Sequence, residues 1–275
     1  MVNFMSLKKV GIIGAGYVGQ AMLKIFPDAL LYDAAPKQGI TLATKEEINR
    51  ECELAIICVP TPAKQEEQEF KQADISIVEE CVQWLETPLI LIKSTVPPGT
   101  TDELALKYKK DICFSPEYVG EGKYQITPWK YMSPDDPRLH DFLIIGGKKD
   151  IRERVANIFL RRLGPEKFYY LIEATEAEIV KYMDNAWGAL KVIFTNEFYQ
   201  LCQAYGASYT RVREGLLLDN RIERMHTAVF TDDQGVTGKC YPKDLNGIVA
   251  AADKKGVDMH LLKSALRKNK EIIKT

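Results

Sequence analysis

A glycine motif directly after a short apolar run constrains the fold of this chain more than any other feature. The run is Val-Gly-Ile-Ile at 10–13, and a helix-like segment over 17–26 overlaps the end of the motif. The motif itself reads Gly14-Ala15-Gly16-Tyr17-Val18-Gly19. A strand, G-x-G-x-x-G and a helix in this order are the dinucleotide-binding fingerprint in its required context. The first glycine makes the turn, the second lets backbone approach a pyrophosphate, and the third permits close helix–strand packing.

An acidic residue follows the next apolar run. Residues 29–32 read Ala-Leu-Leu-Tyr and are followed by Asp33. A carboxylate at the end of the second strand can bind both hydroxyls of a ribose, and it repels a 2′-phosphate. The residues therefore predict that the cofactor is NAD rather than NADP.

The two parts of the chain have different patterns. Short apolar runs in the first part predict strands over 10–13, 29–32, 54–59, 89–93, 111–114 and 142–145. Runs without clean alternation suit strands covered on both faces, and their separation by helix-like segments predicts a doubly wound parallel sheet. From Glu173 onward, helical spacing predicts helices over 174–204, 209–218, 242–255 and 259–273. We therefore expect an α/β fold, with a Rossmann-like domain in 1–172 and an all-helical domain in 173–275.

The segment 174–204 has no proline and one internal glycine, Gly188. At 1.5 Å per residue such a helix is about 45 Å long, more than a small domain spans. We therefore expect it to pack against a second subunit as well as within its own.

Composition excludes several classes of function. The chain has 37 basic and 38 acidic residues, a net charge of −1, which gives no electrostatic case for binding nucleic acid or an anionic membrane. No apolar run reaches membrane-spanning length and no signal-peptide pattern is present, so we expect a cytoplasmic protein. Six cysteines without a C-x-x-C pair and three dispersed histidines argue against a metal site and a disulfide framework. Cys58 reads as a core residue, and 65–72 as a polar surface loop.

Polar residues follow the third, fourth and fifth predicted strands. Val59-Pro60-Thr61-Pro62 ends the third, and Ser94-Thr95-Val96-Pro97-Pro98-Gly99-Thr100 ends the fourth. The fifth is followed by Ser115-Pro116-Glu117-Tyr118-Val119-Gly120-Glu121-Gly122. Ligands bind at the carboxyl ends of such strands, where two acids four residues apart can act as acid, base or hydrogen-bond anchor. Ordinary turn chemistry and a solvated loop are the alternatives.

Two further groups of residues are candidates for a role in catalysis. Lys181 and Asn185 lie four apart on the long helix and share a face, where two donors can stabilise an oxyanion; an exposed pair is the alternative, and Asp184 lies on a neighbouring face. Later, Gly238-Lys239-Cys240-Tyr241-Pro242-Lys243-Asp244 opens a helix. The helix N-terminus and the two lysines should lower the pKa of the Cys240 thiol and favour the thiolate. A buried structural cysteine is the alternative.

Taken in this order, the motifs resemble those of the UDP-glucose/GDP-mannose dehydrogenase family. The resemblance extends from Val10 to about Ile273. It implies a four-electron oxidation in which a sugar CH₂OH becomes a carboxylate and two NAD are reduced, with UDP-glucose to UDP-glucuronate as the expected conversion. It also implies a homodimer built on the long helix.

The resemblance assigns roles to individual residues. Cys240 would be the nucleophile, Lys181 and Asn185 would stabilise oxyanions, and Glu117 and Asp244 would handle protons and water. The residues expected at NAD are Gly14, Gly16, Tyr17, Val18, Gly19, Asp33, Val59, Thr61, Thr95 and Glu121, with Thr95 also near the reacting centre. The residues expected at the substrate are Glu117, Tyr118, Lys181, Asn185, Arg221 and Gly238, with Arg221 reaching the site of a neighbouring subunit.

Two departures from the family pattern concern the substrate. Family members continue into a second α/β domain that holds the nucleotide, so we expect a short form lacking that UDP-binding domain. The glycine-rich loop before the cysteine is replaced by residues 232–239, Asp-Asp-Gln-Gly-Val-Thr-Gly-Lys. Two alternatives stay open: a two-electron β-hydroxyacid dehydrogenase, which has a similar Lys-x-x-x-Asn helix but no catalytic cysteine, and a non-catalytic NAD-binding relative.

Overall fold

A seven-stranded sheet forms the centre of the first part of the chain. The computed structural model describes residues 9–35, 38–64, 69–119 and 136–274. The sheet order is β2-β1-β3-β4-β5-β6-β7. The strands are β1 (Lys9–Ile13), β2 (Leu30–Tyr32), β3 (Cys52–Ile57), β4 (Leu89–Ile92), β5 (Ile112–Phe114), β6 (Phe142–Gly146) and β7 (Phe168–Ile172). The six predicted strands are confirmed, with ends that differ by one or two residues.

The sheet differs from the prediction at its β5–β7 side. β6 runs antiparallel to β5, with Phe114 opposite Gly146, whereas every other neighbouring pair is parallel. The edge strand β7 was not predicted. Its sequence, Phe-Tyr-Tyr-Leu-Ile, is aromatic and half-exposed, so it has neither the continuous apolar run of a covered strand nor a clean alternation.

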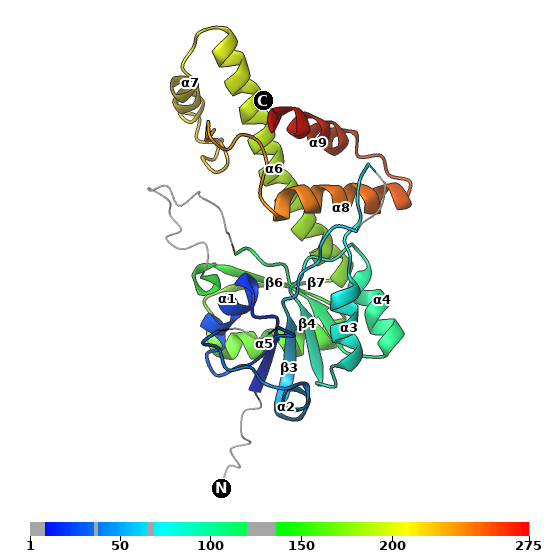
Figure 1. The fold of residues 1–275 in the computed structure, drawn as a ribbon. Helices are drawn as coiled ribbons and strands as arrows, with labels where there is room; N and C mark the ends of the chain where they lie inside the picture. Colours follow the sequence, from blue (N-terminus) through cyan, green and yellow to red (C-terminus); the bar gives the residue numbers. More distant parts are fainter. Residues whose placement is uncertain (1–8, 36–37, 65–68, 120–135, 275) are drawn as a thin grey trace. The chain divides into compact units, whose positions relative to one another are not determined.

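Helices cover both faces of the sheet (Figure 1). α1 (Tyr17–Ile25) and α5 (Lys149–Leu163) pack on one face, where their side chains join those of alternate strand residues such as Leu54 and Ile56. α2 (Lys45–Glu51), α3 (Ser76–Trp84) and α4 (Thr100–Tyr108) cover the other face, with Ala55 and Ile57. This alternation is the period of two of a strand buried on both sides, and it explains the continuous apolar runs of the sequence. A short 3₁₀ helix (Pro137–Leu139) precedes β6.

The chain divides into two compact units. Within the described residues, the first comprises 9–62 and 74–181, and the second comprises 63–73 together with 182–274. The long helix α6 (Ala174–Ala204) passes from the first unit into the second. Of the loop predicted to be polar and at the surface over 65–72, the structure describes 69–72: Glu69 and Lys71 are exposed, whereas Phe70 is buried in the core of the second unit. An aromatic side chain buries a large apolar area, so Phe70 can enter the core while its polar neighbours remain exposed.

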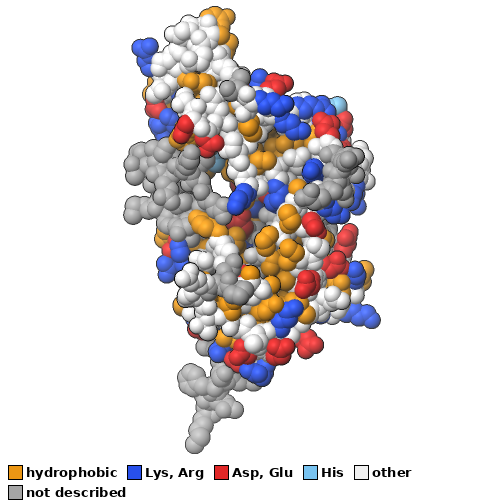
Figure 2. Space-filling view, in the orientation of Figure 1, with side chains coloured by type: hydrophobic (Ala, Val, Ile, Leu, Met, Phe, Trp, Pro, Cys, Tyr) orange, Lys and Arg blue, Asp and Glu red, His pale blue; other side chains and the backbone are white. Residues whose placement is uncertain are grey.

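The second unit is helical, as predicted. It contains most of α6 with α7 (Tyr209–Leu216), α8 (Cys240–Lys254) and α9 (His260–Ile272). Its core joins Ala189 and Ile193 of α6 to Leu245 and Val249 of α8 and to Leu266 of α9. No helix among the described residues is long and apolar enough to cross a membrane. In the space-filling view, basic, acidic and hydrophobic side chains are interspersed (Figure 2).

Candidate active site

The glycine turn after β1 has the shape that a dinucleotide needs. Gly14 has a φ of +102°, and a Cβ there would lie 2.6 Å from the backbone oxygen of Cys58. A side chain at Gly19 would collide with the backbone oxygen of Gly14, whereas a Cβ on Gly16 would meet nothing within 4 Å. The first and third glycines are therefore required by the protein itself, and the second keeps space open beside the start of α1. The strand order reverses between β1 and β3, which is where such sheets bind ligands.

Asp33 is fixed at the same place. Its Oδ2 accepts a hydrogen bond of 2.8 Å from the backbone N–H of Ala15, and its Oδ1 accepts one of 2.9 Å from Ala35. The carboxylate of the second strand therefore lies against the glycine turn, as recognition of a ribose beside a pyrophosphate requires. The glycine turn, the open space at Gly16 and the Asp33 carboxylate are all features that bound NAD requires, so these residues fit NAD. Tyr17 and Val18 are the first two residues of α1, the helix that follows the turn.

The ends of β3 and β4 are joined by side chains. Ser94 Oγ donates a hydrogen bond of 2.7 Å to the backbone oxygen of Val59. Thr61 lies two residues after Val59, Thr95 directly follows Ser94, and both threonines are buried. Thr61 and Thr95, expected at the cofactor, thus follow strands on the switch-point side of the sheet. Glu121, also expected there, lies outside the described residues.

Glu178 was missed by the sequence analysis. It lies in the first turns of α6, is fully buried, and accepts hydrogen bonds from Gly99 N (2.5 Å), Thr101 N (2.8 Å) and Thr101 Oγ1 (2.6 Å). It thus ties α6 to the N-terminus of α4. Burial raises the pKa of this carboxyl to about 7, although the three hydrogen bonds act in the opposite direction. The one sequence signal was its position one helical turn before Lys181.

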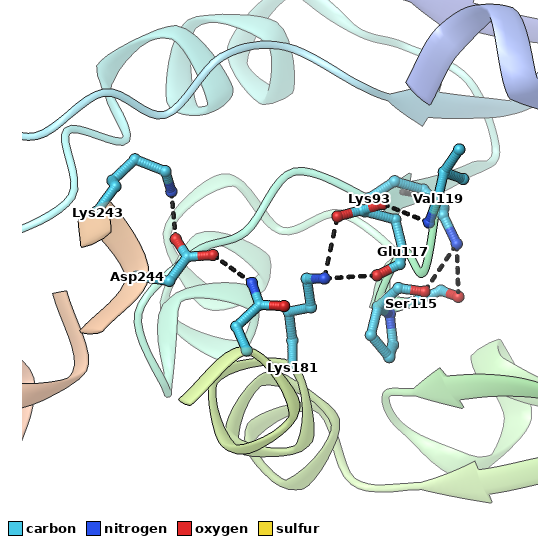
Figure 3. A network of polar contacts seen from close by, with 9 residues as sticks. Lys93, Ser115, Glu117, Val119, Lys181, Lys243 and Asp244 are labelled. Carbon is cyan, nitrogen blue, oxygen red and sulfur yellow. Dashed lines mark hydrogen bonds and ion pairs between the residues drawn. The ribbon is translucent and has the colours of Figure 1, made fainter. Parts of the chain in front are cut away.

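Lys181 and Glu117 form a buried pair within the first unit (Figure 3). The Lys181 Nζ lies 3.0 Å from Glu117 Oε1 and donates to the Glu117 backbone oxygen at 2.6 Å. Glu117 Oε2 accepts a hydrogen bond of 2.9 Å from the backbone N–H of Val119. Tyr118 lies beside the pair, with its ring centroid 5.6 Å from the Lys181 ammonium. The solvated-loop and exposed-pair alternatives are wrong for Glu117 and Lys181.

Asn185 and Asp244 form a second buried pair, within the second unit. Asn185 Nδ2 donates a hydrogen bond of 2.6 Å to Asp244 Oδ2, and Lys243 forms an ion pair with Asp244 Oδ1. Asn185 lies one helical turn after Lys181 on α6, so the shared face predicted for these two side chains is present. Their partners differ: Lys181 holds a loop of the sheet unit, and Asn185 holds the start of α8.

Cys240 is the first residue of α8 and is exposed, whereas the other five cysteines are buried. Cys58 is buried in the core of the first unit, which confirms its reading as a core residue, and this burial raises the pKa of its thiol to about 12. The loop before Cys240 is anchored by Asn269 of α9, a residue that the sequence analysis missed. Asn269 Oδ1 accepts from Val236 N at 2.7 Å, and its Nδ2 donates to Val236 O at 3.0 Å.

Neighbouring residues complete the surroundings of Cys240 within the second unit. The hydroxyl of Tyr241 lies 3.1 Å from His226 Nε2, and Gly188 of α6 makes room for it. Gly238 is exposed two residues before the cysteine. Arg221 is 88% exposed at its side chain and forms an ion pair of 2.7 Å with Asp219. Nothing in the sequence pattern pointed to His226.

The glycine turn, Asp33 and the seven-stranded sheet, followed by a helical unit, define an NAD-binding Rossmann protein. The chain belongs to the UDP-glucose/GDP-mannose dehydrogenase family. The family's NAD binding domain matches residues 26–156, and its central domain matches residues 175–271.

Known relatives agree with this assignment. A UDP-glucose 6-dehydrogenase of Rickettsia bellii is 28% identical over 90% of this chain and 55% of its own length. The UDP-glucose 6-dehydrogenase AglM of Haloferax volcanii is 29% identical over 78% of this chain and 51% of its own. The chain thus spans about half the length of these curated relatives.

Solved structures share the fold. A UDP-glucose dehydrogenase from Pyrobaculum islandicum superposes with a TM-score of 0.77 at 23% identity, over 98% of this chain and 70% of that one. A 3-hydroxyisobutyrate dehydrogenase from Mycobacterium tuberculosis gives a TM-score of 0.67 at 16% identity, over 94% of this chain and 91% of that one.

Proposed function

We propose that this chain catalyses the NAD-dependent, four-electron oxidation of the C6 alcohol of a nucleotide sugar, with UDP-glucose to UDP-glucuronate as the conversion to test first. The placement of Cys240 carries the proposal. It is the exposed one of six cysteines, and it begins a 15-residue helix. The positive end of a helix favours the thiolate, which is the nucleophilic form. A two-electron alcohol oxidation needs no such nucleophile.

In this proposal Cys240 divides the reaction into two oxidations. Loss of a hydride and a proton from the alcohol gives an aldehyde. The Cys240 thiolate adds to the aldehyde carbon, and the resulting thiohemiacetal loses a second hydride and proton to become a thioester. Water then attacks the thioester, the C–S bond breaks, and the carboxylate and thiolate are released. NAD, when bound, accepts the hydrides, so two are reduced for each sugar.

The buried pairs supply the remaining chemistry of the proposal. Lys181 and Asn185 donate hydrogen bonds to the oxyanionic species, because a positioned ammonium and amide stabilise charge that develops on oxygen. Glu117 and Asp244 handle the protons and the water, and Thr95 contributes a hydroxyl near the reacting carbon. Glu117 and Lys181 belong to the first unit, and Asn185 and Asp244 to the second.

We assign contacts with the two ligands as follows. NAD is held by the glycine turn with Tyr17, Val18 and Asp33, and by Val59, Thr61, Thr95 and Glu121. Tyr118, Arg221 and Gly238 contact the sugar nucleotide. Arg221, Arg224 and Lys239 are the cations we propose for its phosphates. Arg221 and Arg224 form exposed ion pairs with Asp219 and Glu214, and such pairs exchange partners at little cost.

A homodimer through the long helix is part of the proposal. Large hydrophobic side chains are exposed along α6 and α7, among them Trp187, Phe194, Phe198, Leu201, Val212 and Leu216. Orange side chains lie at the surface where α6 ends and α7 begins (Figure 2). We expect sedimentation equilibrium to give twice the chain mass, and Phe194→Glu to shift the protein towards monomer. A monomeric wild type would contradict the dimer.

We also propose a cytoplasmic location, since a reactive thiol persists in a reducing compartment.

The first experiment combines the protein with NAD and UDP-glucose and follows the absorbance of NADH, with Cys240→Ser and Cys202→Ser in parallel. Cys202 is buried and serves as the matched control. Two NADH per sugar, with sustained turnover lost only in Cys240→Ser, would support the proposal. NAD binding without turnover across a panel of sugar nucleotides would instead favour a non-catalytic NAD-binding protein.

A two-electron dehydrogenase of the β-hydroxyacid type is the second candidate. The 3-hydroxyisobutyrate dehydrogenase fold matches over nearly the whole of both chains, which is why this candidate is retained. The two activities differ in stoichiometry: one NADH per substrate and full activity of Cys240→Ser would select the two-electron reaction.

A further inference from the structure

Lys93 is a buried ammonium group that the proposed reaction does not use. It directly follows β4, and the residue is 4% exposed. Its backbone N–H donates to Ile57 O at 2.9 Å, which fixes the residue at the carboxyl ends of β3 and β4. A charged group is rarely this deeply buried unless it is paired or has a specific task.

The Lys93 ammonium holds the turn that follows β5. Its Nζ donates to Ser115 Oγ at 3.2 Å and to the backbone oxygen of Pro116 at 2.9 Å. Ser115 is fully buried, and its own N–H donates to Ile92 O at 2.9 Å. Lys93 therefore links the ends of two neighbouring strands through a side chain.

The next residue in the turn is Glu117, and it is held from the other side. Lys93 binds the carbonyl of Pro116 while Lys181 binds the adjacent carbonyl of Glu117 at 2.6 Å (Figure 3). Two ammonium groups from two elements thus hold successive peptide oxygens of one turn. Because the Glu117 carboxylate also contacts Lys181, movement of the Pro116 peptide would carry this carboxylate away from its partner.

We propose that Lys93 is a positioning residue: its ammonium holds the Ser115–Glu117 turn so that the Glu117 carboxylate stays on Lys181, and the hold weakens when Lys93 loses its proton. The proposal deepens the proposed function and rests on it for its kinetic test. Lys93 itself touches neither cofactor nor substrate in this scheme.

The groups that face Lys93 make the hold sensitive to pH. Burial lowers the pKa of Lys93 to about 8; Cys58 and Glu117 act to raise it, and the positive charge of Lys181 lowers it further. His140, which precedes β6, faces the same charge, and its pKa is lowered by burial and by Lys93. Above about pH 8 the folded protein therefore carries a neutral amine at position 93, a weaker donor to two oxygens.

The first test is kinetic and uses Lys93→Met and Lys93→Arg. We expect kcat of Lys93→Met to fall roughly 10- to 100-fold at pH 7, as expected for a displaced catalytic group, with KM for NAD changed less than about threefold. The wild-type kcat should fall above pH 8. This fall of kcat at alkaline pH should be absent from Lys93→Met. It should also be absent from Lys93→Arg below pH 10, since guanidinium keeps its proton. The matched control is Lys110→Met, which removes another ammonium that binds backbone carbonyls, those of Val82, Gln83 and Leu85.

A second test needs no turnover. Amide hydrogen exchange over 115–119, corrected for its intrinsic pH dependence, should be faster in Lys93→Met than in wild type, and in wild type faster at pH 9 than at pH 7. Unchanged exchange, or a fall of kcat at alkaline pH that persists in Lys93→Arg, overturns the proposal. If Lys93→Met does not fold, the Lys93→Arg profile decides. If the wild type turns over no sugar nucleotide, the proposed function fails, and the exchange data alone decide the role of Lys93.

Discussion

Asn185 Nδ2 donates a hydrogen bond of 2.6 Å to Asp244 Oδ2, and both side chains are buried. Because Lys243 engages the other carboxylate oxygen, Asp244 is held on both oxygens. One N–H of the Asn185 amide is committed to this carboxylate, so the orientation of the whole amide is fixed. The pair thus combines two residues that the sequence motifs had placed on separate helices.

We predict that Asp244→Asn lowers kcat at least about 100-fold, the range for loss of a positioned acid–base group. NAD affinity should be unchanged, since the residues expected at NAD lie in the first unit. The measurement is steady-state NADH formation together with calorimetric NAD binding. Asp253→Asn is the control, because Asp253 lies on the same helix but only pairs with Lys263 at the surface. A kcat of Asp244→Asn within twofold of wild type would contradict a role in catalysis.

The Asp33 carboxylate should determine the choice of cofactor. Asp33→Asn keeps an acceptor for the Ala15 N–H but removes the negative charge. We expect the Kd for NAD to rise roughly tenfold and the preference over NADP to shrink, because the repulsion of a 2′-phosphate is gone. Titration calorimetry with both cofactors measures this. Asp28→Asn, which removes a surface partner of Arg162, should change neither affinity; an unchanged preference in Asp33→Asn would be evidence against the assignment.

Gly188 should be intolerant of a side chain. A Cβ there would lie 2.6 Å from the Tyr241 hydroxyl, so Gly188→Ala must displace the residue that follows Cys240. We expect a loss of about 1–3 kcal/mol in the free energy of unfolding from this overpacking, measured by urea denaturation. In Gly215→Ala, on α7, the new Cβ meets nothing within 4 Å, so helix propensity should add about 0.5–1 kcal/mol. Equal effects of the two substitutions would refute the packing argument.

Glu178 should make stability depend on pH. Its folded-state pKa is about 7, above the ordinary value of 4.5, so between these values the folded state binds more protons than the unfolded one. The contribution of Glu178 to stability is therefore present below pH 4.5 and is lost as pH rises towards 7.

Glu178→Gln keeps an acceptor for Thr101 and cannot ionise. Relative to this variant, the wild type should lose about 1–3 kcal/mol between pH 5 and pH 8, measured by urea denaturation across that range. The control is Glu176→Gln, an acidic residue of the first turn of the same helix. A pH-independent difference between wild type and Glu178→Gln would show that burial does not raise this pKa.

Much of the fold follows from local sequence. The six predicted strands were recognised as short apolar runs without clean alternation, and the four predicted helices of the second part were recognised because apolar residues recur at helical spacing. β7 was missed because an edge strand with exposed aromatic residues lacks that signal, and Phe70 was misplaced because its neighbours are polar. The antiparallel approach of β6 could not be predicted, because strand direction depends on the route of the connection and not on the strand's own residues.

The candidate site divides in the same way. Some parts of the site are local patterns with a chemical meaning, and these were recognised in the sequence. They are the spacing of the glycines, Asp33 after the second strand, Lys181 and Asn185 four residues apart, and Cys240 at the start of a helix. Glu178, Lys93 and Asn269 were not recognised. Each is buried and holds a segment that is distant in the sequence, and such a contact leaves no local pattern.

The sequence by itself determined six of the seven strands, the four helices of the second part, the glycine turn with its acid, and the family to which the chain belongs. Periodicity and motif spacing are properties of residues close together along the chain, so they can be read without coordinates. Only the tertiary structure decided which polar groups share a buried site: Lys181 with Glu117, Lys93 with the turn after β5, and Asn185 with Asp244. Burial and hydrogen-bond partners arise when distant segments meet, and no local pattern records which segments those are.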